Sequence, residues 1–177
     1  MNIVHTPLAG CFVIESQVFG DARGSFMESY NKEKFPVDVH FVQDNQSISQ
    51  KGVLRGLHFQ KGEHAQAKLV RVIRGEVLDV AVDIRPNSET FGQHFSIVLN
   101  DKNNKQLFVP RGFAHGFAVL KDDTIFAYKC DNFWNKEAES GIMYNDLDIA
   151  IDWMLSEDEI LLSDKDKILP TLKSLSL

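Results

Sequence analysis

The sequence lacks several features that would place it in a specialised class of protein. No run of apolar residues approaches the ~18 that cross a bilayer, which excludes a transmembrane helix. The two cysteines, Cys11 and Cys130, match no metal-binding or redox spacing, so we expect buried thiols of a cytosolic protein. A Gly-rich phosphate loop, internal repeats and low-complexity segments are also missing. Residues 1–7 have neither a basic region nor a long apolar core, so no signal peptide is expected.

An excess of positive charge is missing too. The net charge of −6 argues against a nucleic-acid binder that relies on bulk positive charge, although local Arg and Lys clusters can still bind a small anion. What is present is the composition of an ordinary soluble globular protein, with 44% apolar and 25% charged residues. The length of 177 residues predicts a single domain spanning residues 1–177.

Short strands separated by tight turns make up most of the chain. We predict strands over residues 11–19, 25–30, 41–49, 53–60, 67–74, 76–84, 93–99, 106–109, 116–120 and 124–131. The pair 67–74 and 76–84 is expected to form a hairpin around Gly75. Helix is expected only in short pieces, one turn at 31–35 and a helix over 156–162 with Ser156 as its N-cap. This pattern predicts an all-β sandwich or barrel.

Residues 53–60 form an apolar strand that is interrupted by an arginine, a glycine and a histidine. Burying a charge without a partner is costly, so Arg55 and His58 are expected to face a cavity. Residues three apart on a regular strand point to opposite faces, so both can enter one pocket only if the strand bulges. Gly56 is the residue that permits such a bulge. The alternative for His58, a satisfied structural histidine, is the commoner fate of a lone histidine in a core strand.

A polar face at a spacing of two precedes this strand. Gln43, Asn45 and Ser47 would lie on one side of it and would form a wet pocket wall, or equally the outer face of an edge strand.

Residues 109–117 contain a Pro-x-Gly-x-x-His element that resembles the second half-motif of cupins, which are jelly-roll barrels. In metal-binding cupins the first half-motif supplies two histidines one residue apart, and a glutamate. The corresponding place here reads His58-Phe59-Gln60, so at most two histidines remain, whereas a catalytic metal usually has three protein ligands. We therefore predict a metal-free pocket. The alternative for His115 is a loop histidine after a turn.

Two further residues could take part in proton transfer. Tyr128 is either a core residue or, near a base, a proton donor, because a phenol can both give and receive a proton. The charged segment 162–166 is either solvated surface or a source of a carboxylate that folds back to orient a histidine.

Taken together, the motifs of residues 21–166 resemble the dTDP-4-dehydrorhamnose 3,5-epimerase family of cupin-fold enzymes. The motifs are Arg23-Gly24 with Glu28, Gln43-Asp44-Asn45, and the segments 54–58, 66–72, 112–117, 128–129 and 163–166. The resemblance implies a cupin-type jelly roll with a few short helices, one near the C-terminus. It also implies cofactor-free epimerisation at C3 and C5 of dTDP-4-dehydro-6-deoxy-D-glucose, giving dTDP-4-dehydro-L-rhamnose for dTDP-L-rhamnose biosynthesis. A cytoplasmic homodimer is implied as well, with each pocket completed by the partner subunit and with no nucleic-acid or membrane partner.

The resemblance further implies a role for each site residue. His58, oriented by Asp166, would remove the proton next to the C4 ketone, and Tyr128 would return a proton to the opposite face. A positioned base and acid contribute ~10²–10⁴-fold in rate. The remaining residues would bind the substrate: Lys68 and His115 at the sugar, Arg23, Glu28, Gln43, Asn45 and Arg55 at the nucleotide diphosphate, Trp134 stacking on a base or sugar, and Glu139 and Lys165 as further contacts.

A few positions depart from the usual family pattern. Residues 132–134 read Asn-Phe-Trp where the family often has Asp-Tyr-Tyr, and Ser140, Met143 and Tyr144 replace a more typical Arg and Arg-Trp. These changes leave the expected base and acid intact, but they leave open whether both carbons are inverted or only one. The alternatives are a mono-epimerase acting on a related dTDP-4-keto sugar, a metal-dependent cupin oxygenase, and a non-catalytic sugar-nucleotide binding module.

Overall fold

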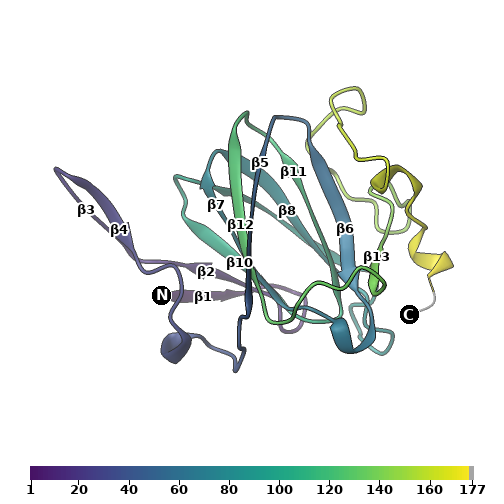
Figure 1. Ribbon diagram of the computed structural model, residues 1–177, viewed down its shortest axis with the longest axis horizontal. Coiled ribbons are helices and arrows are strands. Elements are labelled where there is room, and N and C mark those ends of the chain that lie inside the picture. The colour runs from purple at the N-terminus through teal and green to yellow at the C-terminus, as the bar shows by residue number, and fades with distance from the viewer. Residues whose placement is uncertain (176–177) are drawn as a thin grey trace.

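Two antiparallel sheets and a projecting hairpin make up the computed structural model, which describes residues 1–175 (Figure 1). The six-stranded sheet runs in the order β1 (Asn2–His5), β2 (Phe12–Glu15), β10 (Lys105–Val109), β7 (Lys68–Arg74), β12 (Thr124–Cys130) and β5 (Gln43–Ser49). The five-stranded sheet runs in the order β13 (Glu139–Gly141), β6 (Leu54–Gln60), β11 (Phe113–Val119), β8 (Glu76–Asp83) and β9 (His94–Asn100). The hairpin consists of β3 (Val18–Asp21) and β4 (Gly24–Met27). The predicted all-β class is confirmed.

The side chains of β8 point alternately to the two faces of its sheet, and this explains how the core is layered. Leu78, Val80 and Val82 belong to a cluster that also contains Ile149 and Trp153 from the C-terminal part of the chain. The opposite face of β8 contributes Val77 and Ala81 to the cluster between the two sheets. Both faces of the strand are therefore buried, and the C-terminal segment covers the outer face of the five-stranded sheet (Figure 1).

The predicted hairpin around Gly75 is wrong. β7 pairs with β10 and β12, whereas β8 pairs with β11 and β9 in the other sheet. Gly75 has a φ of +89°, and a Cβ there would collide with the side chain of Thr124. The tight turn is thus a corner at which the chain passes between the sheets, because each strand finds its hydrogen-bonding partners elsewhere in the sequence.

The predicted helix over residues 156–162 is also wrong. Ser156 and Glu159 do form half of a capping box, since the Glu159 carboxylate accepts the backbone N–H of Ser156 at 3.1 Å. The chain leaves the helical path after one turn because Leu161 pairs with residues 52–54. The Leu161 amide donates to the Gly52 carbonyl at 2.8 Å, and the Leu161 carbonyl accepts from the Leu54 amide at 3.0 Å. The helices are short 3-10 turns: η1 (Lys32–Lys34), η2 (Gly62–His64), η3 (Asp166–Ile168) and η4 (Leu172–Ser174). The expected turn at 31–35 corresponds to η1.

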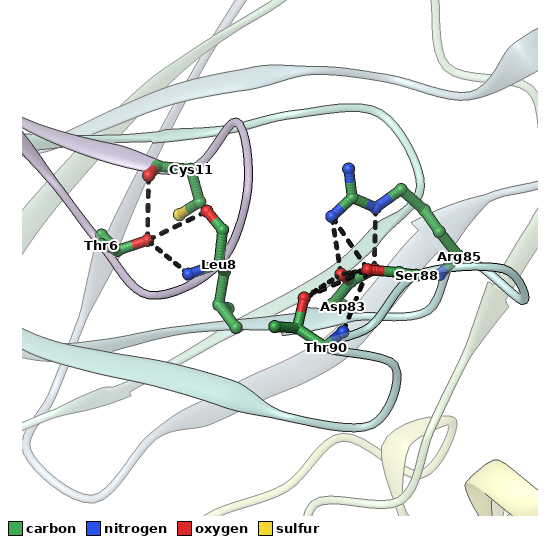
Figure 2. A network of polar contacts seen from close by, with 7 residues as sticks. All are labelled: Thr6, Leu8, Cys11, Asp83, Arg85, Ser88 and Thr90. Atoms are coloured by element: carbon green, nitrogen blue, oxygen red, sulfur yellow. Dashed lines mark hydrogen bonds and ion pairs between the residues drawn. The ribbon is translucent and has the colours of Figure 1, made fainter.

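A buried carboxylate organises the loop between β8 and β9 (Figure 2). Asp83 accepts hydrogen bonds from Arg85 Nη2 at 2.6 Å, Ser88 Oγ at 2.5 Å and Thr90 Oγ1 at 2.6 Å. Burial alone would raise the pKa of Asp83, but these donors hold that pKa well below its usual range. The network fixes one end of the sandwich.

Both cysteines are buried free thiols, as predicted. Burial raises the pKa of Cys11 to about 12 and that of Cys130 to about 11. Thr6 anchors the first of them, donating to the Cys11 carbonyl at 2.9 Å (Figure 2). None of the helices in residues 1–175 is long and apolar enough to cross a membrane.

Candidate active site

The pairing of β6 with β11 contains the bulge predicted at Gly56. His58 pairs with His115 and Arg55 pairs with Phe117, so three steps along β6 match two along β11. Gly56 has a φ of +123°, and a Cβ there would lie 2.8 Å from the His115 carbonyl oxygen. Only glycine allows this approach, and its consequence is that Arg55 and His58 line one cavity.

The site is a cleft with two lobes between the sheets. The histidine lobe, about 630 Å³, is lined among others by Arg55, His58, His115, Phe117, Ser163, Lys165 and Asp166. The aromatic lobe, about 420 Å³, is lined among others by Gln43, Gln60, Gln66, Phe133, Trp134 and Glu139. The two lobes share a wall formed by Asn45, His58, Lys68 and Tyr128.

β5 is the edge strand of its sheet, yet its polar face lines the cleft. Gln43 borders the aromatic lobe, Ser47 the histidine lobe, and Asn45 both. The pocket-wall interpretation of this alternating pattern is therefore confirmed. The hydroxyl of Ser47 is buried and has no hydrogen-bond partner within residues 1–175.

A buried carboxylate from the C-terminal segment holds His58. The Nε2 atom of His58 lies 2.5 Å from Asp166 Oδ1, and the two residues are 108 positions apart. Burial would raise the pKa of Asp166, but the hydrogen bond and charge of His58 and the hydrogen bond from Ser163 lower it. Asp166 is therefore ionised at neutral pH, which gives the arrangement of a base and its orienting group.

His115 has a carboxylate partner of its own. It lies within β11, so the loop interpretation is wrong, and its Nε2 is 3.0 Å from Oδ2 of the fully buried Asp79. Sequence reasoning did not select Asp79 as a site residue. The signal was its position between Val77 and Ala81 on a buried strand face, where a carboxylate without a partner would be costly.

Lys68 and Tyr128 lie next to each other on the shared wall. The Lys68 ammonium is 5.8 Å from the centre of the Tyr128 ring. Burial lowers the pKa of Lys68, because desolvation disfavours the charged form. Burial raises the pKa of Tyr128, so its phenol stays protonated at neutral pH and can donate a proton.

Two of the predicted substrate residues lie away from this cleft. Arg23 stands on the projecting hairpin (Figure 1), where its side chain is 90% exposed and pairs with Asp21 at 2.6 Å. Glu28 follows the hairpin and pairs with Lys34 at 2.9 Å. Neither residue lines either lobe.

The other predicted contacts border the cleft. Arg55 is an exposed residue that lines the histidine lobe and donates to Ser49 Oγ at 3.2 Å. Trp134 borders the aromatic lobe, and Lys165 forms an ion pair with Glu139 at 2.5 Å.

Gln60, which stands where a metal-binding cupin has a ligand, makes a structural hydrogen bond. Gln60 is buried, and its Oε1 accepts from the Asn135 amide at 3.1 Å. Within the part of the chain that the structure describes, no three His, Cys, Asp or Glu residues are grouped so as to hold a metal ion.

Comparison with known proteins assigns the family. The sequence model of the dTDP-4-dehydrorhamnose 3,5-epimerase family matches residues 5–174. The chain belongs to this family. The dTDP-4-dehydrorhamnose 3,5-epimerase of Escherichia coli (strain K12) is 50% identical over 179 residues, covering 99% of this chain and 96% of the relative.

Solved structures of the 3,5-epimerase family share the fold. The Elizabethkingia anophelis NUHP1 enzyme superposes with a TM-score of 0.94 at 54% identity, covering 98% of this chain and 97% of that one. The Legionella pneumophila Philadelphia 1 dTDP-6-deoxy-D-glucose-3,5-epimerase, solved with dTDP-4-keto-L-rhamnose, gives 0.94 at 46% identity, covering 99% and 94%. The sandwich is therefore the cupin-type jelly roll that the resemblance implied.

Proposed function

We propose that this chain converts dTDP-4-dehydro-6-deoxy-D-glucose to dTDP-4-dehydro-L-rhamnose by inverting C3 and C5, in dTDP-L-rhamnose biosynthesis. The observation that carries the proposal is the arrangement around the shared wall. A histidine held by an ionised carboxylate, a neutral phenol and a lysine all border one cleft, in a member of the 3,5-epimerase family. These groups are a base, an acid and a cation, which is the set that enolate chemistry needs.

Proton abstraction is assigned to His58. Its Nε2–H donates to Asp166, which leaves Nδ1 as the basic nitrogen. The proton leaves the carbon next to the C4 ketone, and the electron pair moves to the ketone oxygen to form an enolate. Lys68 and His115 border the lobe in which that oxygen would lie, with Asp79 behind His115, so the lysine ammonium stabilises the developing negative charge.

Inversion requires that the proton return from the other side of the sugar. Tyr128 donates its phenolic proton to the enolate carbon, and the resulting tyrosinate and imidazolium then exchange protons with water. The raised pKa of Tyr128 supports this role, because the group is fully protonated at the start of each cycle. The same pair of residues can act at C3 and at C5, since both carbons flank the C4 ketone.

We place the nucleobase in the aromatic lobe. Trp134 offers a flat aromatic surface there, and Gln43 and Asn45 offer amides along the same wall. Arg55 lines the histidine lobe and is an exposed residue, and its guanidinium suits bidentate binding of a diphosphate.

A homodimer that completes each cleft would account for the two residues that lie outside it. The hairpin formed by β3 and β4 projects from the sandwich and exposes Phe19 and Phe26, the latter by 70%. A projecting hairpin with exposed aromatic residues would carry Arg23 and Glu28 to the cleft of a second copy. The Phe26→Asp variant is expected to be monomeric by light scattering and to bind dTDP more weakly. A dimer with unchanged affinity would refute this arrangement.

Deuterium exchange tests the reaction. Incubation of the enzyme with substrate in D2O is expected to place deuterium at both C3 and C5. Label at one carbon alone would reduce the activity to mono-epimerisation, and label at neither would refute the epimerase. His58→Asn is expected to retain dTDP binding and to lose exchange, whereas a non-catalytic binding module would be unchanged by it. Activity lost on chelation, together with stoichiometric metal, would favour the cupin oxygenase.

A further inference from the structure

Two glutamines from opposite sheets hold consecutive backbone amides at the mouth of the aromatic lobe. Gln43 of β5 accepts the Trp134 N–H at 3.0 Å through its Oε1. Gln60 of β6 accepts the Asn135 N–H at 3.1 Å through its Oε1. The loop 132–135 is therefore fastened to the six-stranded sheet and to the five-stranded sheet at adjacent residues.

A third glutamine holds the start of the same loop. Gln66 donates from Nε2 to the Asn132 carbonyl at 2.8 Å. Asn132 in turn donates to the Glu63 carbonyl at 2.9 Å, and its side-chain oxygen accepts the Phe133 N–H at 2.9 Å. The hydrogen bonds that the three glutamines and Asn132 make at this loop thus come from uncharged amides, and the side chain of Asn135 adds a contact between its Nδ2 and His64 Nε2 at 3.4 Å.

The fastened loop presents two aromatic residues that are each more than half exposed. Phe133 is 65% exposed and Trp134 is 53% exposed, and both border the aromatic lobe. Large exposed aromatic residues at a cleft mouth favour a ligand with a flat π-face, because a nucleobase stacks on an aromatic side chain. A mobile loop would lose part of the stacking energy to the entropy of ordering.

We propose that Gln43, Gln60 and Gln66 are positioning residues that hold Phe133 and Trp134 as a platform for the nucleobase of the substrate. This inference rests on the proposed function, because it assumes a nucleotide ligand. It also assigns a purpose to Gln60, which stands where a metal-binding cupin has a ligand. Each amide is used with a defined polarity: Gln43 and Gln60 accept a hydrogen bond, whereas Gln66 donates one.

Because of that polarity, replacing glutamine by glutamate is expected to affect dTDP binding differently at Gln60 and at Gln66. Gln60→Glu keeps an acceptor oxygen toward the Asn135 amide, whereas Gln66→Glu replaces a donor by a carboxylate that faces a carbonyl. We expect Gln66→Glu, Gln66→Met and Gln60→Met to raise the Kd for dTDP about threefold to tenfold, the range that loss of one hydrogen bond gives. Gln60→Glu and Gln66→Glu both add one negative charge, so the smaller rise in the Kd is expected for Gln60→Glu, which keeps the acceptor oxygen.

The test combines calorimetric titration of the intact enzyme with dTDP and steady-state exchange in D2O. The expected result is a raised Kd and KM with kcat retained, which also shows that the variants are folded. Amide exchange is expected to be faster at Asn135 in Gln60→Met than in Gln60→Glu. Equal dTDP affinity in all four variants would overturn the inference, as would equal losses in Gln60→Glu and Gln66→Glu, or a parallel fall of kcat and affinity. A wild-type enzyme that does not bind dTDP would instead refute the proposed function.

Discussion

Replacing Asp166 by asparagine tests the central contact of the site with little change in shape. The carboxylate lies 2.5 Å from His58 Nε2 and holds the imidazole with its Nε2 protonated. An asparagine can present its amide N–H to the ring instead, which favours the tautomer whose basic nitrogen faces away from the sugar. Asp166 is 3% exposed, so bulk solvent compensates little for the lost charge.

The expected loss follows from two contributions. A hydrogen bond to a charged group contributes about 1.5–3 kcal/mol, and each ~1.36 kcal/mol is tenfold in rate, so the bond alone accounts for about 10- to 150-fold. The wrong tautomer adds to this, and the equivalent change in Ser-His-Asp enzymes costs ~10⁴ in kcat. We expect kcat for Asp166→Asn to fall about 10²- to 10⁴-fold.

The assay is the rate of deuterium incorporation at C3 and C5 from D2O, followed by NMR, with dTDP affinity measured alongside. Asp164→Asn is the matched control, because Asp164 lies in the same segment but its carboxylate is fully exposed and pairs with Lys167. The control is expected to keep its rate within about twofold, since exposed ion pairs contribute little. A rate for Asp166→Asn within tenfold of the wild type would refute the orienting role, as would an equal loss of dTDP affinity.

Three further outcomes follow from the geometry. Tyr128→Phe is expected to lower product formation ~10²–10⁴-fold. Deuterium is still expected to enter the substrate without inversion, because His58 can return a deuteron to the face from which it took the proton, and NMR of the recovered substrate measures this label. Gly56→Ala is expected to lower the free energy of unfolding by ~3 kcal/mol or more, against ~1 kcal/mol for Gly62→Ala, which has open space around it; urea unfolding measures both. Asp83→Asn is expected to cost ~3 kcal/mol at pH 7. Because the folded pKa of Asp83 lies below the unfolded value of ~3.9, that difference should shrink as the pH falls below ~4, and a difference unchanged by pH would contradict it.

The features that could be predicted from sequence depend on local chemistry. The bulge at Gly56 follows from a polar pair spaced wrongly for one strand face, and only glycine relieves that conflict. The two faces of β8 follow from alternation, and the polar face of β5 from the spacing of Gln43, Asn45 and Ser47. In each case the residues that decide the outcome lie within a few positions of one another.

The features that sequence reasoning missed depend on distant partners. The sequence of a glycine turn between two apolar strands looks the same whether the two strands pair with each other or enter different sheets. At Gly75 the strands β7 and β8 pair with other parts of the chain. Ser156 starts a helical turn that ends because Leu161 pairs with Gly52. The pairing of Asp79 with His115 spans 36 positions, and no local pattern connects them.

The wall that the two lobes share has a consequence for how such an enzyme can change. Asn45, His58, Lys68 and Tyr128 border both the lobe that we propose for the nucleobase and the lobe that we propose for the sugar, so a substitution there is expected to alter affinity and turnover together. Residues that border one lobe alone, such as Trp134 or Leu162, can vary with an effect on one property only. Divergence toward a different sugar or a different base is therefore expected to accumulate at the unshared ends of the cleft, while the wall between them stays under joint selection.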